Sequence, residues 1–252
     1  MLIRQIINVA ATATILSVAN LAHAQDEASD KTFTSSGNVT VITDYKFRGI
    51  SQSNSDPAIQ GGLDGNWSNG FYIGLWAASV DFDSRGRTPG SCCDGSLELD
   101  YYAGWASSIG DAGIDIDLGY AYYTYPADNK SDANFGELHA NGTWKDLKIG
   151  VHYTNEYYLE SGETWYAYGE YTTTLPWETS LSVHAGYSFL EENGGFVSSD
   201  KDGYYDYTVT LSKAIWGYDW TLAYVGSDLD EDDVFGYDWA DSTATFSIGK
   251  SF

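Results

Sequence analysis

Acidic side chains recur at every second position in several stretches of the sequence, a spacing that gathers carboxylates on one face of an extended strand. Asp115 and Asp117 are the clearest example, because Ile114, Ile116 and Leu118 alternate with them. Carboxylates gathered in this way attract cations, and charged linings set the ion preference of membrane pores. The spacing therefore points to a surface that favours positive charge.

The polar face predicted from this alternation carries many more acids than bases. The acids are expected at Asp44, Asp64, Glu98, Asp100, Asp115, Asp117, Glu137, Glu156, Glu170, Asp206 and Asp219, and the bases at Lys46, Arg48 and Lys148. Because these bases cannot neutralise all of the acids, we expect a pore lined by them to prefer cations. The alternative, that these side chains only solvate an interior and pair within it, fits the sequence equally well.

Asp44, Lys46 and Arg48 share one face of their segment by the same spacing. They could pair with acids across an interior and narrow it. A structural clamp is at least as good an interpretation of these three residues as a contact with a solute.

Ser182 and His184 are two positions apart, which suits a nucleophile and its general base. An enzyme that degrades lipid from within a barrel would need such a pair on its lipid face, with an orienting group. Both residues are instead predicted to face the interior. We therefore expect no enzyme, and a hydrolase is the least favoured function.

Two further groups invite comparison with metal sites. The run from Asp228 to Asp233 begins like a calcium loop, but Asp233 stands where such a loop needs glycine, so a solvated acidic loop is the better interpretation. Cys92 and Cys93 leave a vicinal disulfide, a contact between molecules or two free thiols open, because adjacent cysteines bridge only through a strained ring. Two cysteines alone make no zinc site, so no metal or cofactor is expected.

The elements that must position these residues are strands. About twelve segments of roughly ten residues alternate with period two. They are expected at residues 38–47, 58–67, 71–82, 97–106, 114–125, 135–144, 147–158, 165–175, 179–189, 204–213, 218–226 and 243–252. Past the N-terminal stretch, no apolar run is long enough for a membrane-spanning helix, whereas such alternation suits strands with one face toward lipid.

The links between these segments alternate between short and long. Short links fall near residues 68–69, 110–111, 145–146, 176 and 215–217, and long ones span 48–57, 83–96, 126–133, 159–164, 190–203 and 227–242. Outer-membrane barrels have short periplasmic turns and longer extracellular loops. The sequence therefore predicts an all-β fold, a closed antiparallel transmembrane β-barrel of about twelve strands.

Aromatic residues favour the same fold, because they gather near both ends of the predicted strands. Those near the short turns are Trp67, Trp105, Trp144, Trp177 and Trp216, and those near the long loops are Tyr45, Phe47, Tyr122, Tyr157, Trp165, Tyr187, Phe189, Tyr205 and Tyr224. Two aromatic belts are typical of a barrel with two membrane interfaces. Aromatic pairing across the strands of a soluble sheet is the alternative.

The N-terminal residues have the pattern of an export signal. Arg4 precedes an apolar stretch, and Ala22-His23-Ala24 fits the small-x-small cleavage pattern. An uncleaved membrane anchor is the alternative, but the apolar stretch is short for one. We therefore expect a cleaved signal peptide at residues 1–24, a short periplasmic segment at 25–37 and a single barrel domain at 38–252.

The chain is strongly acidic, with a formal net charge of −24 at pH 7. Nucleic acid is not an expected partner, because phosphate contacts need basic patches. Phe252, with Ile248 and Phe246 on the same face, resembles the terminal signal read by the barrel-assembly machinery. Lys250 departs from that pattern, since a hydrophobic residue is usual there.

A family resemblance is carried by NVTVITDYKFRGISQ at 38–52, DPAIQGG at 56–62, GFYIGLW at 70–76 and VDF at 80–82. These strings resemble the TorF family of porins, and the sharp matching fades after about residue 105, although length, leader and terminal Phe agree over the whole chain. The resemblance implies an outer-membrane location and a pore, and it carries over no catalytic residue.

Together these patterns predict a porin-like channel in the outer membrane of a Gram-negative bacterium, through which small cationic or neutral solutes diffuse passively. The alternative is a non-conducting structural or surface-binding barrel, plugged by inward loops. The partners expected are outer-membrane lipids and lipopolysaccharide, the barrel-assembly machinery through Phe252, and small solutes.

Overall fold

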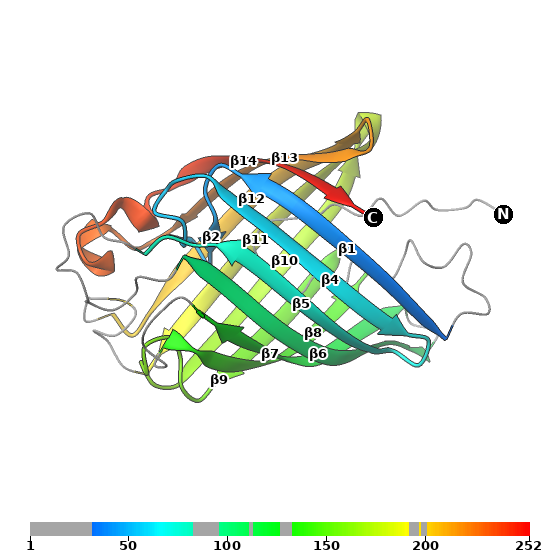
Figure 1. Cartoon of the computed structure of the whole chain (residues 1–252), viewed down its shortest axis with the longest axis horizontal. Helices are drawn as coiled ribbons and strands as arrows, with labels where there is room; N and C mark the ends of the chain where they lie inside the picture. The colour runs from blue at the N-terminus through cyan, green and yellow to red at the C-terminus, as the bar shows by residue number, and fades with distance from the viewer. Residues whose placement is uncertain (1–31, 83–95, 111–112, 127–132, 192–196, 198–200) are drawn as a thin grey trace.

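The computed structural model describes residues 32–82, 96–110, 113–126, 133–191, 197 and 201–252. The expected signal peptide at 1–24 and the adjacent Cys92 and Cys93 lie outside these residues. In the described part, twelve strands form one closed antiparallel β-barrel, as the alternation predicts (Figure 1).

The barrel strands follow one another in sequence around the wall, and β1 pairs with β14 to close it. They are β1 (Phe33–Ile42), β4 (Ala58–Trp67), β5 (Phe71–Ser79), β6 (Leu97–Ile109), β7 (Ile114–Thr124), β8 (Phe135–Trp144), β9 (Leu147–Thr154), β10 (Thr164–Leu175), β11 (Thr179–Leu190), β12 (Gly203–Ile215), β13 (Tyr218–Ser227) and β14 (Thr243–Ser251). Among the connecting residues that the structure describes, three 3₁₀ helices occur, η4 (Pro176–Glu178), η5 (Glu231–Val234) and η6 (Asp238–Ala240). Within the described residues, no helix has the length and apolarity needed to cross a membrane.

Closure joins the first strand to the last. β1 pairs with β4 along its whole length, but with β14 only from Asn38 to Ile42. Gly37 and Phe252 then exchange two backbone hydrogen bonds, each of 2.9 Å. The seam between β1 and β14 is therefore shorter than the pairing between β1 and β4.

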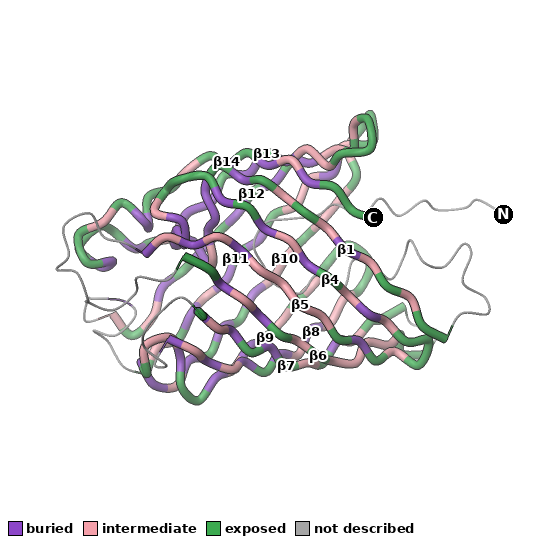
Figure 2. The backbone as a smooth tube through the Cα atoms, viewed as in Figure 1, coloured by how far each residue is buried: buried purple, intermediate pink, exposed green. Residues whose placement is uncertain are grey.

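Buried and exposed residues alternate along the strands (Figure 2), as expected where one face points inward and the other outward. The outward face forms an apolar band, whose exposed members include Val39, Val41, Ile59, Leu63, Ile73, Leu118, Leu138, Ile149, Val183 and Leu222. Soluble proteins rarely expose so much contiguous apolar surface, whereas a wall that faces lipid requires it.

Short turns gather at one end of the barrel and long loops at the other. Two of the short turns hold Trp177 (φ 61°) and Trp216 (φ 56°) in the left-handed backbone region, which residues other than glycine rarely adopt. These two side chains are 83% and 89% exposed. Their exposure at the strand ends suits anchors at a membrane interface.

The first strand differs from the prediction of 38–47. β1 ends at Ile42, and residues 33–37, expected in a periplasmic segment, belong to it. Tyr45 is fully buried and Phe47 is half-buried, so neither joins the outer aromatic belt, and Tyr157 is buried as well. The alternation of apolar and polar residues continues past the strand because these aromatic rings pack inside the barrel.

Two apolar clusters fill the loop end of the interior. The first surrounds Tyr45 and includes Ile42, Ala58, Ala78, Val80, Phe82, Ala121, Tyr123, Tyr125, Ala133, Phe135 and Tyr157. The second surrounds Ile50 and includes Val197, Tyr204, Leu229, Val234, Trp239 and Ala240. Each cluster contains a residue of the segment 43–57, so this segment is packed into the loop end of the barrel on both sides.

Candidate functional site in the barrel interior

Residues 43–57, between β1 and β4, turn into the barrel and form what we call the inward hairpin. Its arms are β2 (Lys46–Phe47) and β3 (Ile50–Ser51), which pair with each other. Arg48 (φ 47°) and Gly49 (φ 84°) form its tip, with the positive φ angles that a two-residue hairpin turn requires. The tip therefore projects Arg48 away from the base of the hairpin.

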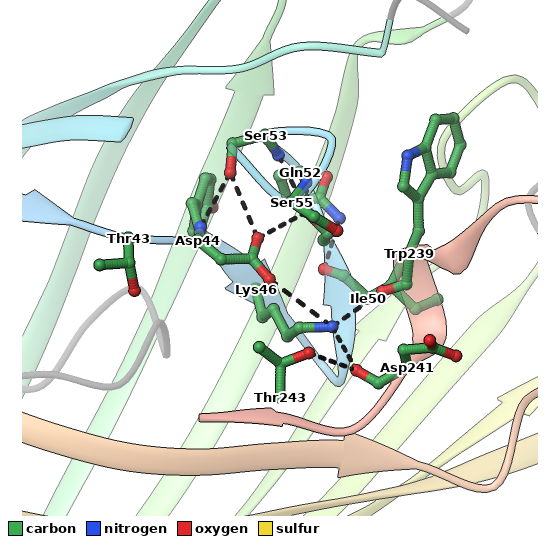
Figure 3. Close-up of polar contacts among 12 residues, drawn as sticks. Thr43, Asp44, Lys46, Ile50, Gln52, Ser53, Ser55, Trp239, Asp241 and Thr243 are labelled. Carbon is green, nitrogen blue, oxygen red and sulfur yellow. Dashed lines mark hydrogen bonds and ion pairs between the residues drawn. The ribbon is translucent and has the colours of Figure 1, made fainter. Parts of the chain in front are cut away.

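Asp44 organises the base of the inward hairpin (Figure 3). Its Oδ1 accepts hydrogen bonds from Ser51 Oγ at 2.6 Å and from Ser53 Oγ at 3.3 Å. Ser53 Oγ in turn accepts from the backbone N–H of Tyr45 at 2.9 Å. The Asp44 carboxylate is thus used within the hairpin, which corrects its predicted position on a strand face that lines the interior.

Arg48 joins the tip of the hairpin to the barrel wall. Its Nη2 donates to Glu137 Oε2 on β8 at 2.7 Å, and its guanidinium lies 4.1 Å from the centre of the Tyr166 ring on β10. His152 on β9 reaches the same carboxylate, with 2.6 Å between Nδ1 and Glu137 Oε1. Burial works against the charge of Arg48, but Glu137 raises the pKa of the guanidinium above its usual value overall.

Lys46 joins the hairpin to the last long loop (Figure 3). Its Nζ donates to the carbonyl oxygens of Trp239 at 3.0 Å and Asp241 at 2.7 Å, and lies 3.7 Å from Asp44 Oδ2. Burial lowers the pKa of this ammonium group, and the charge of Asp44 acts in the opposite direction. Trp239 Nε1 also donates to Asn54 Oδ1 at 3.0 Å, so the loop and the hairpin hold each other.

Gly49 brings the hairpin against a second part of the wall, two strands beyond β10. A Cβ atom at Gly49 would lie 2.8 Å from Cβ of Ser227 on β13 and 3.3 Å from Cβ of Asp206 on β12. The tip therefore contacts β8 to β10 through Arg48 and β12 and β13 through Gly49. The inward hairpin spans the interior as a bar, so Lys46 and Arg48 act from a hairpin and not from the strand face on which they were predicted.

The predicted strand residues occupy inward positions of the alternation. They are Asp64 on β4, Glu98 and Asp100 on β6, Asp115 and Asp117 on β7, Glu137 on β8, Lys148 on β9, Glu170 on β10, Asp206 on β12 and Asp219 on β13. Glu156 is an exception, because β9 ends at Thr154 and Glu156 is exposed in the following loop. There its Oε1 accepts from the backbone N–H of Gly162 at 3.0 Å and shapes the loop.

Tyrosines that hydrogen-bond the inward acids were missed by sequence reasoning. Tyr72 Oη donates to Asp117 Oδ1 at 2.7 Å, and Tyr102 Oη donates to Asp64 Oδ1 at 2.5 Å. A neutral hydroxyl satisfies a carboxylate oxygen without cancelling its charge, so the interior remains acidic. The sequence did carry a signal for this role. Tyr72 occupies the same set of alternate positions on β5 as Trp76, and Tyr102 occupies the same set on β6 as the inward acids.

Several inward tyrosine rings lie against glycines of neighbouring strands. A Cβ atom at Gly186 would lie 2.5 Å from Cζ of Tyr166, well inside van der Waals contact. Cβ atoms at Gly104 and Gly150 would likewise meet the rings of Tyr72 and Tyr168. These glycines leave room for large rings to lie along the barrel wall. The sequence alone does not distinguish them from glycines that have no ring packed against them.

Ser182 and His184 each have separate partners. His184 Nε2 lies 2.8 Å from Tyr166 Oη and 3.3 Å from Asp206 Oδ1, while Ser182 Oγ accepts from Thr172 Oγ1 at 3.1 Å. Their hydrogen bonds do not link them as a nucleophile and its base.

The acidic loop at 228–233 uses its carboxylates as caps. Asp230 Oδ1 accepts from the Asp233 N–H at 3.3 Å, and Asp233 Oδ2 accepts from the Asp230 N–H at 3.0 Å, at the start of η5. Lys201 Nζ lies 2.6 Å from Asp233 Oδ2, and this hydrogen bond raises the pKa of Lys201. In the part of the chain that is described, no group of three or more His, Cys, Asp or Glu residues is arranged to hold a metal ion.

Solved structures with a similar barrel include two porins. A KdgM porin is 10% identical with a TM-score of 0.50, covering 87% of this chain and 98% of that chain. A NanC porin is 14% identical with a TM-score of 0.50, covering 86% of this chain and 98% of that chain. At such low identity this likeness establishes the fold alone.

Sequence comparisons identify a family. No curated protein matches the chain. The model of a family described as "Bacterial protein of unknown function (Gcw_chp)" matches residues 24–252. This name differs from TorF, so the TorF resemblance stays a prediction. Because the match covers most of the sequence, the chain belongs to the bacterial Gcw_chp family.

Proposed function

We propose that this protein is a porin-like channel of the bacterial outer membrane, through which small cationic or neutral solutes diffuse passively. The observation that carries the proposal is a closed barrel with an apolar outer band and an inward face rich in carboxylates. The likeness of the fold to the KdgM and NanC porins supports a channel. It does not bear on the identity of the solute.

The charge of the interior supports a preference for cations. Among the described residues on the inward face, Arg48 pairs with Glu137 and Lys46 approaches Asp44. Asp117 accepts hydrogen bonds from Tyr72 and Asn141, which carry no charge, and His139 Nε2 lies 3.3 Å from its Oδ2. The inward carboxylates therefore outnumber the lysine and arginine side chains that pair with them, so the potential in the interior favours positive ions.

The inward hairpin supports a second candidate, a barrel that does not conduct. Its tip is fixed to β8 by Arg48 and touches β12 and β13 through Gly49, and Lys46 ties it to the last long loop. Such a bar either sets the narrowest part of a pore or closes it. Conductance of the intact protein separates these two functions.

The deciding experiment is single-channel recording of the refolded protein in planar bilayers with a salt gradient. A channel predicts conductance steps whose reversal potential favours cations, and a weaker preference in the Asp115→Asn/Asp117→Asn variant. Glu231→Gln/Asp232→Asn removes the same two charges from the exposed outer loop and is expected to leave the preference unchanged. Absence of steps from protein that is folded and inserted would overturn the channel and favour the closed barrel.

The proposal includes a location and a route of assembly. Export by the signal peptide and insertion by the barrel-assembly machinery through Phe252 would place the apolar band in the outer membrane of a Gram-negative bacterium. Phe252 is 73% exposed, which suits recognition by another protein. The acidic loops would then face anionic lipopolysaccharide, where divalent cations can bridge the two.

A further inference from the structure

Two lysines lie on the outward face of the wall, at the end of the barrel where the short turns gather. Lys213 on β12 is opposite Trp220 on β13, which is opposite Ile248 on β14, so these three side chains share the outward face. Lys250 follows Ile248 by two positions and lies on the same face, opposite Val39 of β1. Both lysines therefore meet surroundings that otherwise hold apolar and aromatic side chains.

The protein supplies no counter-charge to either lysine. Neither ammonium group forms an ion pair with a described residue. The outward positions of β1 and of β11 to β14 carry no Asp or Glu, although the chain has 36 acids against 12 Lys and Arg. A charge on a lipid-facing strand is destabilising to a degree that depends on its depth, so water or lipid must compensate for it.

The two lysines lie on either side of β13, between its neighbours β12 and β14 (Figure 1). Their backbones are two strands and two residues apart, which corresponds to about 12 Å. Two extended lysine side chains can bridge that distance, so their ammonium groups can meet at one anion over β13. Lys250 Nζ already lies 5.1 Å from the centre of the Tyr218 ring on β13. Trp216 in the adjoining turn is highly exposed, which suits the level of the membrane interface.

We propose that Lys213 and Lys250 together bind the phosphate group of an anionic phospholipid on the outer face of β12 to β14. The occupant is a lipid because the apolar and aromatic side chains around the lysines would contact acyl chains, which a free phosphate ion lacks. Since short turns of outer-membrane barrels face the periplasm, the lipid would come from the periplasmic leaflet. The site rests on the membrane location in the proposed function, but it does not require the barrel to conduct.

The competing explanation is that each lysine extends separately to water and attracts anionic lipid only through its own charge. The two explanations differ in how the single substitutions combine. A phosphate held by both lysines makes their contributions non-additive, so the loss of either one removes most of the lipid preference. Independent attraction predicts that each single substitution removes only about half of it.

The test is native mass spectrometry of the refolded protein, released from micelles that contain equal amounts of phosphatidylglycerol and phosphatidylcholine. We expect the native protein to retain phosphatidylglycerol several-fold more than phosphatidylcholine. Lys213→Met and Lys250→Met should each lose most of this preference. Both variants should fold, because methionine removes a charge from a lipid-facing position. Lys213→Arg/Lys250→Arg keeps both charges and should keep the preference.

Lys145→Met is the matched control. Its ammonium group also lies near an aromatic ring, 4.4 Å from the centre of the Trp144 ring, but in the turn between β8 and β9. This variant should keep the preference.

Three results would overturn the site. They are equal retention of the two lipids by the native protein, additive losses in the single variants, and the same loss in Lys145→Met. Displacement of the bound lipid by millimolar inorganic phosphate would show a site for a free anion and would overturn the assignment to a lipid. A protein that conducts without a lipid preference refutes the site alone, whereas a lipid preference without conductance refutes the channel alone.

Discussion

Arg48 is the residue whose contacts most constrain the interior. Its guanidinium is buried between the Glu137 carboxylate and the face of the Tyr166 ring, with His152 at 3.4 Å. Such a pair contributes little net stability relative to apolar residues, but removing one partner leaves a buried charge without compensation. The pair therefore fixes the position of the hairpin tip more than it stabilises the barrel.

Replacing Arg48 tests this arrangement. Arg48→Met should lower the free energy of unfolding by about 3–5 kcal/mol, because Glu137 stays buried and loses its permanently charged partner, keeping His152 as a neighbour. Arg48→Met/Glu137→Gln should recover a large part of that loss. Urea unfolding in detergent micelles measures both variants.

Lys148→Met is the matched control for this comparison. It removes another inward cation, whose ammonium lies 5.8 Å from the Tyr168 ring and forms no ion pair with the described residues. We expect a change below about 1 kcal/mol. Equal losses of unfolding free energy in Arg48→Met and in Arg48→Met/Glu137→Gln would show that Glu137 does not need Arg48.

At the scale of the element, tyrosines and glycines of adjacent strands fit together. Gly186 on β11 lies under the ring of Tyr166 on β10, where a methyl group has no space. At Gly169 on β10, an added Cβ atom would have no neighbouring atom within 4 Å, and the backbone has no positive φ angle. One glycine is thus required by packing and the other is not.

The two glycines give a paired prediction. Gly186→Ala should lower the free energy of unfolding by about 1–3 kcal/mol, because the Tyr166 ring must leave its position and its hydrogen bonds. Gly169→Ala should be neutral or slightly stabilising, since it reduces the freedom of the unfolded chain. Urea unfolding in micelles again measures the change, and a similar loss in both variants would contradict the packing explanation.

Strand periodicity predicted most of the wall, and the reason is physical. The bounds of β4 at Ala58–Trp67 agree with the prediction, because lipid outside and polar groups inside impose strict alternation on a wall strand. The segment after Ile42 alternates as well, but it packs inside the barrel and not in its wall. Alternation with period two shows that a segment has two different faces. It does not show whether those faces contact lipid, water or packed side chains.

The interior contacts were harder to predict because they are distant in sequence. Arg48 and Glu137 are separated by 89 positions, and Lys46 and Trp239 by 193. An acid and a base on the inward face show that an ion pair is possible. Which acid meets which base depends on how the strands are placed around the closed barrel. The tyrosine hydroxyls were missed for the same reason, since an aromatic residue fits a belt, a core or a hydrogen bond equally well.

At the scale of the whole molecule, the wall and the hairpin are separate structures. Every barrel strand pairs with two neighbours, and β1 pairs with β4 from Phe33 to Ile42 without help from the hairpin. The wall should therefore survive removal of the hairpin, although its interior would lose packing and ion pairs.

This separation predicts the effect of shortening the hairpin. Replacing residues 44–56 by Asn-Gly, a favoured two-residue turn, should keep the barrel folded and raise its single-channel conductance several-fold. Planar bilayer recording measures the conductance, and circular dichroism checks the fold. An unchanged conductance in a folded variant would mean that the hairpin is not the narrowest part of the interior.

The fit of Tyr166 against Gly186 has a consequence for how this family diverges. A mutation of Gly186 to any larger residue is tolerated only after the ring at position 166 has been replaced by a smaller side chain. This order, with the ring lost before the glycine, leaves a gap that costs less than a clash. Homologous sequences should therefore show the two positions changing together, with glycine opposite a small residue as the common evolutionary intermediate.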